Sequence, residues 1–150
     1  MPQIVLATPD DQTAIESIVE NAYSHYIERI GMKPGPMRDD YADYINRGYV
    51  RVLKDEDGVA AIIVLMVEPD AMLLDNVAVA PHAQGKGYGR LLMEFAEQQT
   101  QSAGLTTIKL YTHELMTENQ AIYKKRGYLE THRAEQNGLK RVFMEKHLDA

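Results

Sequence analysis

The chain has 150 residues, of which 45% are hydrophobic and 25% charged, with a net charge of −6 and no cysteine. This is the composition of an ordinary globular protein of one domain's length, and the lack of cysteine excludes disulfides and thiolate metal sites. The acidic balance argues against nucleic-acid binding, which depends on neutralising phosphates. The longest apolar run, residues 59–67, is too short to span a bilayer, and the first residues lack the features of a secretory signal. We therefore expect a cytoplasmic protein that does not act on membranes.

The first fifty residues predict one short strand and two helices. Residues 3–8 fit a strand, and the apolar positions from Ile15 to Ile30 keep the spacing of one buried face in a helix that begins near Gln12. Two prolines and two glycines in residues 31–37 end that helix, because this composition cannot continue one. A second, shorter helix is expected over residues 39–47.

From residue 49 the apolar period changes from helical to extended. Three apolar runs separated by turn-forming residues at 55–58 and 68–71 predict an antiparallel meander. The later elements are expected to be a helix at 87–103, a strand at 106–114, a helix at 117–127 capped by Thr117, and strands at 128–133 and 139–148 around a loop at 134–138.

The predicted order of elements is β-α-α-β-β-β-α-β-α-β-β, an α+β fold. The helix at 87–103 crosses between two strands, so at least one pair of strands in the mostly antiparallel sheet must be parallel. The sequence has no internal repeat and no linker-like segment. We therefore expect residues 1–150 to form a single domain.

Residues 78–95, AVAPHAQGKGYGRLLMEF, place three glycines at alternate positions between a strand and a helix. A P-loop would need a glycine at position 80, where Ala80 stands, and the dinucleotide fingerprint would need one at Arg90. Both motifs therefore fail. A glycine-rich turn that opens a helix still suits an anion, because backbone N–H groups are unpaired there and no Cβ atoms block a bulky pyrophosphate. The alternative is a tight turn with no ligand.

The surrounding residues resemble the GNAT superfamily of acyl-CoA-dependent N-acyltransferases. Residues 84–89, QGKGYG, are similar to the Q/R-x-x-G-x-G/A signature of that family, and they follow the strand LLDNVAVAP. Residues 118–128, ENQAIYKKRGY, resemble a second signature, an Asn and a Tyr on a helix that ends in Gly-Phe/Tyr. The element order and length match as well, so the resemblance covers nearly the whole chain. It implies a three-layer α/β/α-like fold with a sheet that is splayed at the CoA site.

The resemblance implies acetyl-CoA as co-substrate and assigns the residues that hold it. Backbone amides of residues 84–90 would bind the pyrophosphate, the free backbone of residues 77–79 would pair with the pantetheine arm, and basic side chains would contact phosphates. Without a ligand, the same residues are explained by strand packing, a helix cap at Asn119 and solvated charges. The candidate CoA-binding residues are Val77, Ala78, Val79, Gln84, Gly85, Lys86, Gly87, Tyr88, Gly89, Arg90, Asn119, Tyr123 and Lys125.

Acyl transfer to an amine requires the amine to attack as the neutral base and the departing thiolate to take up a proton. Tyr123 falls on the family's position for the acid that protonates the thiolate, although it also fits a core aromatic position. Asp75 lies two residues before Val77, so strand alternation directs it toward the same opening, where it would accept the amine's proton, anchor the ammonium group or cap the strand end. Glu68 is the fallback for the base.

In this family the first helices and the last hairpin cover the acceptor side. That placement makes Tyr26, Arg29 and Tyr41 candidate substrate-binding residues, with core packing as the alternative, and leaves Arg133 and Arg141 open. The histidines show no metal-ligand spacing, and no G-x-S-x-G elbow indicates a hydrolase.

The function that the resemblance implies is transfer of an acetyl group from acetyl-CoA to the primary amine of a small molecule, by direct attack in a ternary complex. Two alternatives stay open. One is acetylation of a protein lysine or N-terminus, and the other is a non-catalytic acyl-CoA sensor, which would need neither Tyr123 nor Asp75. Many relatives are dimers, so a homodimer is compatible with the resemblance.

Overall fold

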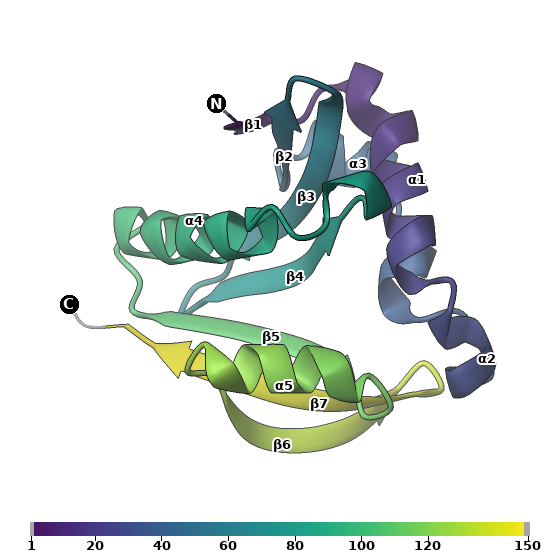
Figure 1. Ribbon diagram of the computed structural model, residues 1–150. Coiled ribbons are helices and arrows are strands. Elements are labelled where there is room, and N and C mark those ends of the chain that lie inside the picture. The colour runs from purple at the N-terminus through teal and green to yellow at the C-terminus, as the bar shows by residue number, and fades with distance from the viewer. Residues whose placement is uncertain (1, 149–150) are drawn as a thin grey trace.

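The structure is a computed structural model that describes residues 2–148; the predicted domain, 1–150, thus includes three residues outside the described part (Figure 1). The strands are β1 (Gln3–Leu6), β2 (Val50–Asp55), β3 (Gly58–Val67), β4 (Met72–Val79), β5 (Thr107–His113), β6 (Leu129–Gln136) and β7 (Leu139–His147). The α-helices are α1 (Gln12–Tyr23), α2 (Tyr26–Ile30), α3 (Tyr41–Asn46), α4 (Tyr88–Ser102) and α5 (Thr117–Lys125), joined by short 3₁₀ turns at Pro9–Asp11, Gly35–Arg38 and Pro81–Ala83.

The described strands form one sheet in the order β1-β2-β3-β4-β5-β7-β6. Neighbouring strands are antiparallel except for β4 and β5, which are parallel, so the mixed sheet predicted from the crossover helix is confirmed. The two parallel strands pair only at Met72–Ile108 and Leu73–Lys109. Beyond these pairs they diverge, and the sheet opens into a wedge between its two halves (Figure 1).

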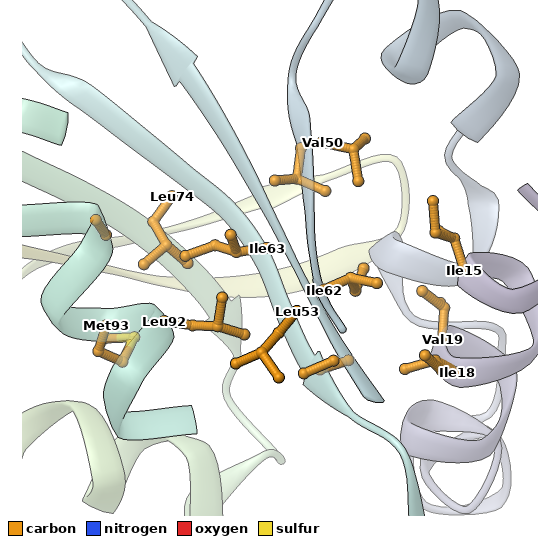
Figure 2. Packing of buried hydrophobic residues seen from close by; sticks show 14 of the residues in the cluster. Ile15, Ile18, Val19, Val50, Leu53, Ile62, Ile63, Leu74, Leu92 and Met93 are labelled. Atoms are coloured by element: carbon orange, nitrogen blue, oxygen red, sulfur yellow. The ribbon is translucent and has the colours of Figure 1, made fainter. Parts of the chain in front are cut away.

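Helices cover both faces of the sheet, and the core lies between them. Figure 2 shows Leu92 and Met93 of α4 on one side of the strands, and the α1 residues Ile15, Ile18 and Val19 on the other. The consecutive β3 residues Ile62 and Ile63 point to opposite faces, as strand geometry requires. Since both faces are covered, the middle of β3 is buried without interruption from Ala60 to Val64.

The helix expected to continue to Ile30 is divided in two. α1 ends at Tyr23, and α2 starts at Tyr26 after a turn in which the Ile27 amide donates to the Ser24 carbonyl, a bond of three residues instead of four. Both tyrosines are buried. Residues three apart on one face allow such a tightened turn as well as a continuous helix, so the apolar spacing alone could not show the break.

The C-terminal elements differ from expectation in two details. Thr117 is the first residue of α5 and not its cap, which is Met116. The predicted loop at 134–138 is a two-residue turn, because Asn137 and Gly138 both adopt positive φ, 52° and 79°, as the tight turn of a hairpin requires. β6 therefore extends to Gln136, and β7 inserts between β5 and β6.

Candidate functional site

The divergence of β4 from β5 opens a cavity of about 870 Å³, which we call the large cavity. Its volume falls within the roughly 300–1,000 Å³ typical of small-molecule and cofactor sites. β4, the glycine-rich turn and the helices α1, α4 and α5 all contribute to its wall. The predicted CoA-binding residues that line it are Val77, Ala78, Val79, Gln84, Gly89, Arg90, Asn119, Tyr123 and Lys125.

Two glycines at the entry to α4 adopt a left-handed backbone conformation. φ is 85° at Gly85 and 80° at Gly87, a region in which side chains are strained. The amides of Gly85, Lys86 and Gly87 donate to no backbone carbonyl in the described chain, and the first turn of α4 leaves further N–H groups unpaired. These amides and the positive end of the helix dipole can bind an anion.

Gly89 differs from the other two glycines of the turn. It lies inside α4, and an added Cβ would find its nearest atom, Val79 Cγ2, at 3.9 Å, which is ordinary van der Waals contact. Neither conformation nor packing therefore demands a glycine at this position.

Basic side chains approach the large cavity from α4 and from the end of α5. Arg90, Lys125 and Arg126 line it, and the buried Arg126 Nε has no hydrogen-bond partner among residues 2–148. Arg126 belongs to the basic residues from which the sequence allows a local basic pocket, although it was not among the predicted CoA-binding residues.

Lys86 and Tyr88 point elsewhere. Lys86 Nζ lies 3.8 Å from Asp55 Oδ2, and the Tyr88 hydroxyl donates to the same oxygen at 2.9 Å. Their side chains thus fasten the glycine-rich turn to the end of β2. Contacts of these two residues with CoA stay a prediction. Because their side chains are bound to Asp55, their backbone amides are the groups that would contact CoA.

The two α5 residues of the second motif, Asn119 and Tyr123, line both the large cavity and a smaller one beside it. The Tyr123 ring packs 5.9 Å from that of Tyr128, and its hydroxyl forms no hydrogen bond within the described chain. Burial, and secondarily the neighbouring Tyr26 hydroxyl, raises the pKa of Tyr123 to about 12. Tyr123 therefore keeps its proton at neutral pH and can donate it.

The start of α5 is ordered by a residue that sequence reasoning missed. The buried Gln120 Nε2 donates to the carbonyl oxygens of His113 at 3.2 Å and Glu114 at 3.0 Å. Asn119 caps nothing, and its Nδ2 lies 3.8 Å from Met116 Sδ. Its side chain is thus available to the two cavities.

The small cavity has a volume of about 40 Å³ and shares Tyr23, Asn119 and Tyr123 with the large cavity. Pro34, Gly35 and Pro36 line the small cavity, as do Leu139 and Arg141 of β7. The two segments lie close together, because Arg38 Nη1 donates to the Asn137 carbonyl at 3.2 Å. The proline-glycine segment that ends the N-terminal helices and the last hairpin therefore both contribute to the wall of the small cavity.

Asp75 lies in the wall of the small cavity. The β3–β4 register passes from Leu65–Leu74 to Val64–Asn76 and skips Asp75, which is therefore a bulge residue. Its Oδ1 accepts a 2.9 Å hydrogen bond from the Tyr111 hydroxyl, while its Oδ2 is buried with no donor among residues 2–148. Strand alternation predicted that the side chains of Asp75 and Val77 point toward the same opening in the sheet. This prediction is wrong, because the bulge places Asp75 in the wall of the small cavity and Val77 in the wall of the large one.

A second carboxyl group, which the sequence analysis did not single out, faces Asp75. Asp39 precedes the α3 cap Asp40, and its carboxyl group is near enough to that of Asp75 for each to shift the pKa of the other. Burial, and then the charge of Asp75, raises the pKa of Asp39 to about 7, while the Tyr44 hydroxyl and then the charge of Arg141 oppose this rise. Burial likewise raises the pKa of Asp75. The sequence gives one indication of this role: Asp39 and Asp40 are adjacent aspartates, and the cap of α3 needs only Asp40.

A buried chain of hydrogen bonds supports the junction of the two cavities. The Tyr23 hydroxyl, which lines both cavities, donates to Asn76 Oδ1 at 2.6 Å and lies 3.2 Å from the Val77 carbonyl. Asn76 Nδ2 donates to the Tyr41 hydroxyl, which donates to the Pro36 carbonyl. The candidate substrate residue Tyr41 thus holds the segment over the small cavity without lining that cavity.

The other two candidate substrate residues lie at the α2–α5 contact. Tyr26 lines the large cavity, and the Arg29 guanidinium lies 5.1 Å from its ring centroid. Arg29 Nη1 pairs with Glu118 Oε1 at 2.7 Å, and this hydrogen bond lowers the pKa of Glu118 to about 2. The Arg29 side chain is therefore occupied in joining α2 to α5, and its contact with a substrate stays a prediction.

The two arginines left open by the sequence analysis have different surroundings. Arg133 is paired with Glu130 and Glu114 at the surface. Arg141 lines the small cavity, and its guanidinium lies 4.1 Å from the Tyr111 ring centroid. Arg141 and Tyr111 come from strands that are neighbours only through the insertion of β7, a pairing that no local pattern reveals.

Two kinds of feature are absent from the described part of the chain. Residues 2–148 bring together no group of three or more His, Asp or Glu side chains that could hold a metal ion. Within that part of the chain, no helix has both the length and the apolar character needed to cross a membrane.

Comparison with known proteins shows which family has this sequence pattern. The model of the acetyltransferase (GNAT) domain matches residues 46–130, more than half of the chain. The matched part includes β4, the glycine-rich turn, α4 and α5.

Two curated relatives have related names. The chain is 28% identical over 94 residues, 62% of its length, to the uncharacterized N-acetyltransferase YvbK of Bacillus subtilis, and it spans 61% of that relative's length. It is 26% identical over 121 residues to the [ribosomal protein bS18]-alanine N-acetyltransferase of Haemophilus ducreyi, which covers 76% of this chain and 81% of that protein.

The fold is also shared with solved structures. The PaiA N-acetyltransferase of Thermoplasma acidophilum, solved in complex with coenzyme A, superposes with a TM-score of 0.74 at 20% sequence identity. The superposition covers 98% of this chain and 99% of that one. At this identity, the likeness establishes the predicted fold.

Proposed function

The chain belongs to the GNAT family of acetyltransferases, and from that premise we propose that it transfers the acetyl group of acetyl-CoA to the nitrogen of a small primary amine. Residues 1–150 form one catalytic domain in this proposal. The observation that carries it is that two cavities share the lining residues Tyr23, Asn119 and Tyr123. The large cavity has the size and the anion-binding turn for acetyl-CoA, and the small one has room for an amino group beside a carboxylate.

The residues around the large cavity fit coenzyme A. The unpaired amides of the turn that contains Gly85 and Gly87 bind the pyrophosphate, and the unpaired edge of β4 beyond Leu73 binds the pantetheine arm. Arg90, Lys125 and Arg126 supply positive charge for the phosphates. The chain therefore binds acetyl-CoA with its thioester end directed toward Tyr123.

The side chains at the junction supply the proton movements. Bound acetyl-CoA supplies the acetyl group as a thioester. The Asp75 carboxylate takes a proton from the incoming ammonium group, so that the nitrogen can attack as the neutral amine. The Tyr123 hydroxyl, protonated at neutral pH, gives its proton to the departing sulfur.

The size of the small cavity favours a small acceptor. The segment at 34–36 and the strand β7 both line it, and its volume of about 40 Å³ leaves little room for an extended peptide. Acetylation of a protein N-terminus is the second candidate, favoured by the similarity to the alanine N-acetyltransferase of H. ducreyi. That function would require the proline-glycine segment to move aside.

The test is thiol release from acetyl-CoA with two sets of acceptors. One set holds small primary amines, such as polyamines, amino acids and aminoglycosides, and the other holds peptides that begin with alanine or contain lysine. We expect turnover with at least one small amine and little with any peptide. Turnover with peptides alone would replace the proposal by its second candidate, and acetyl-CoA binding without any turnover would favour a sensor.

A further inference from the structure

Two carboxyl groups face each other on the acceptor side of the site, although the proposed reaction needs only one. Asp75 comes from the bulge in β4, and Asp39 comes from the segment just before α3. Asp75 Oδ1 is bonded to Tyr111, whereas its buried Oδ2 has no donor among residues 2–148. A proton held on Asp39 would supply the missing donor.

The surroundings of the pair leave little to neutralise a second negative charge. Arg141 is the cation that acts on both carboxyls, and it forms no ion pair of 4.0 Å or less with either. Within residues 2–148, four tyrosine hydroxyls also act on the pair: those of Tyr23 of α1, Tyr41 and Tyr44 of α3, and Tyr111 of β5. His113 of β5 lines the same small cavity, and burial lowers its pKa, which keeps it neutral.

We propose that Asp39 is a positioning residue that makes Asp75 a proton acceptor matched to neutral pH, because the two facing carboxyls hold one proton between them. This inference rests on the proposed function, and it identifies the carboxyl pair as the group that accepts the proton of the acceptor amine. An isolated carboxylate is a weak base. The pKa of its acid form is far below that of an ammonium group, so the transfer of a proton from the ammonium group to the carboxylate is strongly unfavourable. Two carboxyls in contact cannot both ionise easily, so the proton that they share is held far more tightly.

The nitrogen of the ammonium group loses two protons in the proposed reaction. The doubly ionised pair removes one proton from the ammonium group, and the neutral nitrogen forms its bond to the thioester carbon while the carbonyl electrons move to oxygen. Collapse reforms the carbonyl and breaks the carbon–sulfur bond. The sulfur takes the Tyr123 proton, and the second proton that the nitrogen loses restores Tyr123. The first proton stays on the Asp39–Asp75 pair and leaves to solvent, so each turnover gives amide, free thiol and one H⁺.

The pair has a signature in the pH profile of kcat/KM for the amine. Between about pH 5 and 8.5 an aliphatic amine stays an ammonium ion, so changes in rate report on the protein. Activity of the wild-type protein should rise with a midpoint near 7, the pKa that burial and the Asp75 charge give Asp39. In Asp39→Asn the second charge is gone, so the midpoint should fall by at least one pH unit, and the plateau should fall on the order of 10-fold because the remaining base is weaker.

The matched control is Asp40→Asn, the same chemical change one residue later. Asp40 is exposed, and its carboxylate accepts the Asp43 amide at the α3 cap, a role that Asn also fills. This variant should keep the wild-type midpoint. Acetyl-CoA affinity, measured in parallel, should be unchanged in both variants.

Two results would overturn the inference while the proposed function stands. One is a folded, acetyl-CoA-binding Asp39→Asn protein whose midpoint equals that of the wild type. The other, which needs no variant and decides the matter if Asp39→Asn does not fold, is a wild-type midpoint near the ordinary range of a single carboxyl, about 4. A wild-type protein that turns over no amine at all would instead remove the proposed function, and this inference with it.

Discussion

Among single residues, Tyr123 has the most direct part in the proposed reaction, because it lines both cavities and its hydroxyl has no hydrogen-bond partner in the described chain. Tyr123→Phe keeps the ring and its packing but removes the proton that the sulfur needs. We expect kcat to fall about 100-fold or more, the usual range for a positioned acid, with acetyl-CoA affinity unchanged. Steady-state thiol release and calorimetric binding measure the two effects, and an unaltered kcat would remove Tyr123 from the reaction.

Tyr128 offers the matched control for that substitution. Its ring packs on Tyr123 and its buried hydroxyl has no hydrogen-bond partner within residues 2–148, but it lines neither cavity. Burying an unpaired hydroxyl is unfavourable, so Tyr128→Phe should raise the free energy of unfolding by about 1 kcal/mol and leave kcat unchanged. Urea denaturation gives the first quantity. A loss of stability would mean that the hydroxyl has a partner, such as a water molecule.

At the scale of elements, the glycine-rich turn and α4 provide a prediction with an internal control. Gly87→Ala places a Cβ in the left-handed region at φ 80°, which costs about 1–2 kcal/mol, and disturbs the amides that would hold the pyrophosphate. Gly89→Ala lies in the helix, where its Cβ would meet only ordinary van der Waals contact, and should stabilise the helix by up to about 1 kcal/mol. Because Gly89 also lines the large cavity, this variant is a control for stability only. We expect weaker acetyl-CoA binding in Gly87→Ala, and an affinity equal to that of the wild type would argue against the turn as the binding site.

Elements with a strong local signal could be predicted from the sequence, and those set by distant contacts could not. The periodicity of α4 and the turn-formers around β3 fixed those elements to within a residue or two. The break between α1 and α2 and the bulge at Asp75 gave no such signal, because each depends on packing against other parts of the chain. For the same reason the glycines and Tyr123 were found by motif, whereas Asp39, Tyr111 and Arg141 needed the sheet order.

At the scale of the whole molecule, the carboxyl pair should make stability depend on pH. The pKa of Asp39 is raised in the folded protein to about 7 from an ordinary value of 3.8. A raised pKa gives stability that is fully present below the unfolded value and is lost as the pH rises through the folded one. Between about pH 4 and 7 the free energy of unfolding should therefore decrease because of this group.

Urea denaturation across that range is the check. Asp39→Asn should flatten the decrease and be more stable than the wild type at pH 8, whereas Asp40→Asn should follow the wild type. The buried Asp11 acts in the opposite direction but in a separate window, because its hydrogen bonds and Lys54 lower its pKa, so its contribution is lost only below about pH 4. A wild-type curve that rises steadily from pH 4 to 7 would contradict the burial of a second carboxyl beside Asp75.

The central claim is acetyl transfer in one complex of protein, acetyl-CoA and amine, and initial-rate kinetics of the wild-type protein test it most directly. Thiol release would be followed while both substrates are varied around their KM values, with the acceptor taken from the small primary amines. We expect double-reciprocal lines that intersect, an N-acetylated product in equal amount to the thiol, and no thiol release without amine. Parallel lines with an acetylated protein would contradict direct attack, and absence of acetyl-CoA binding would contradict the whole account.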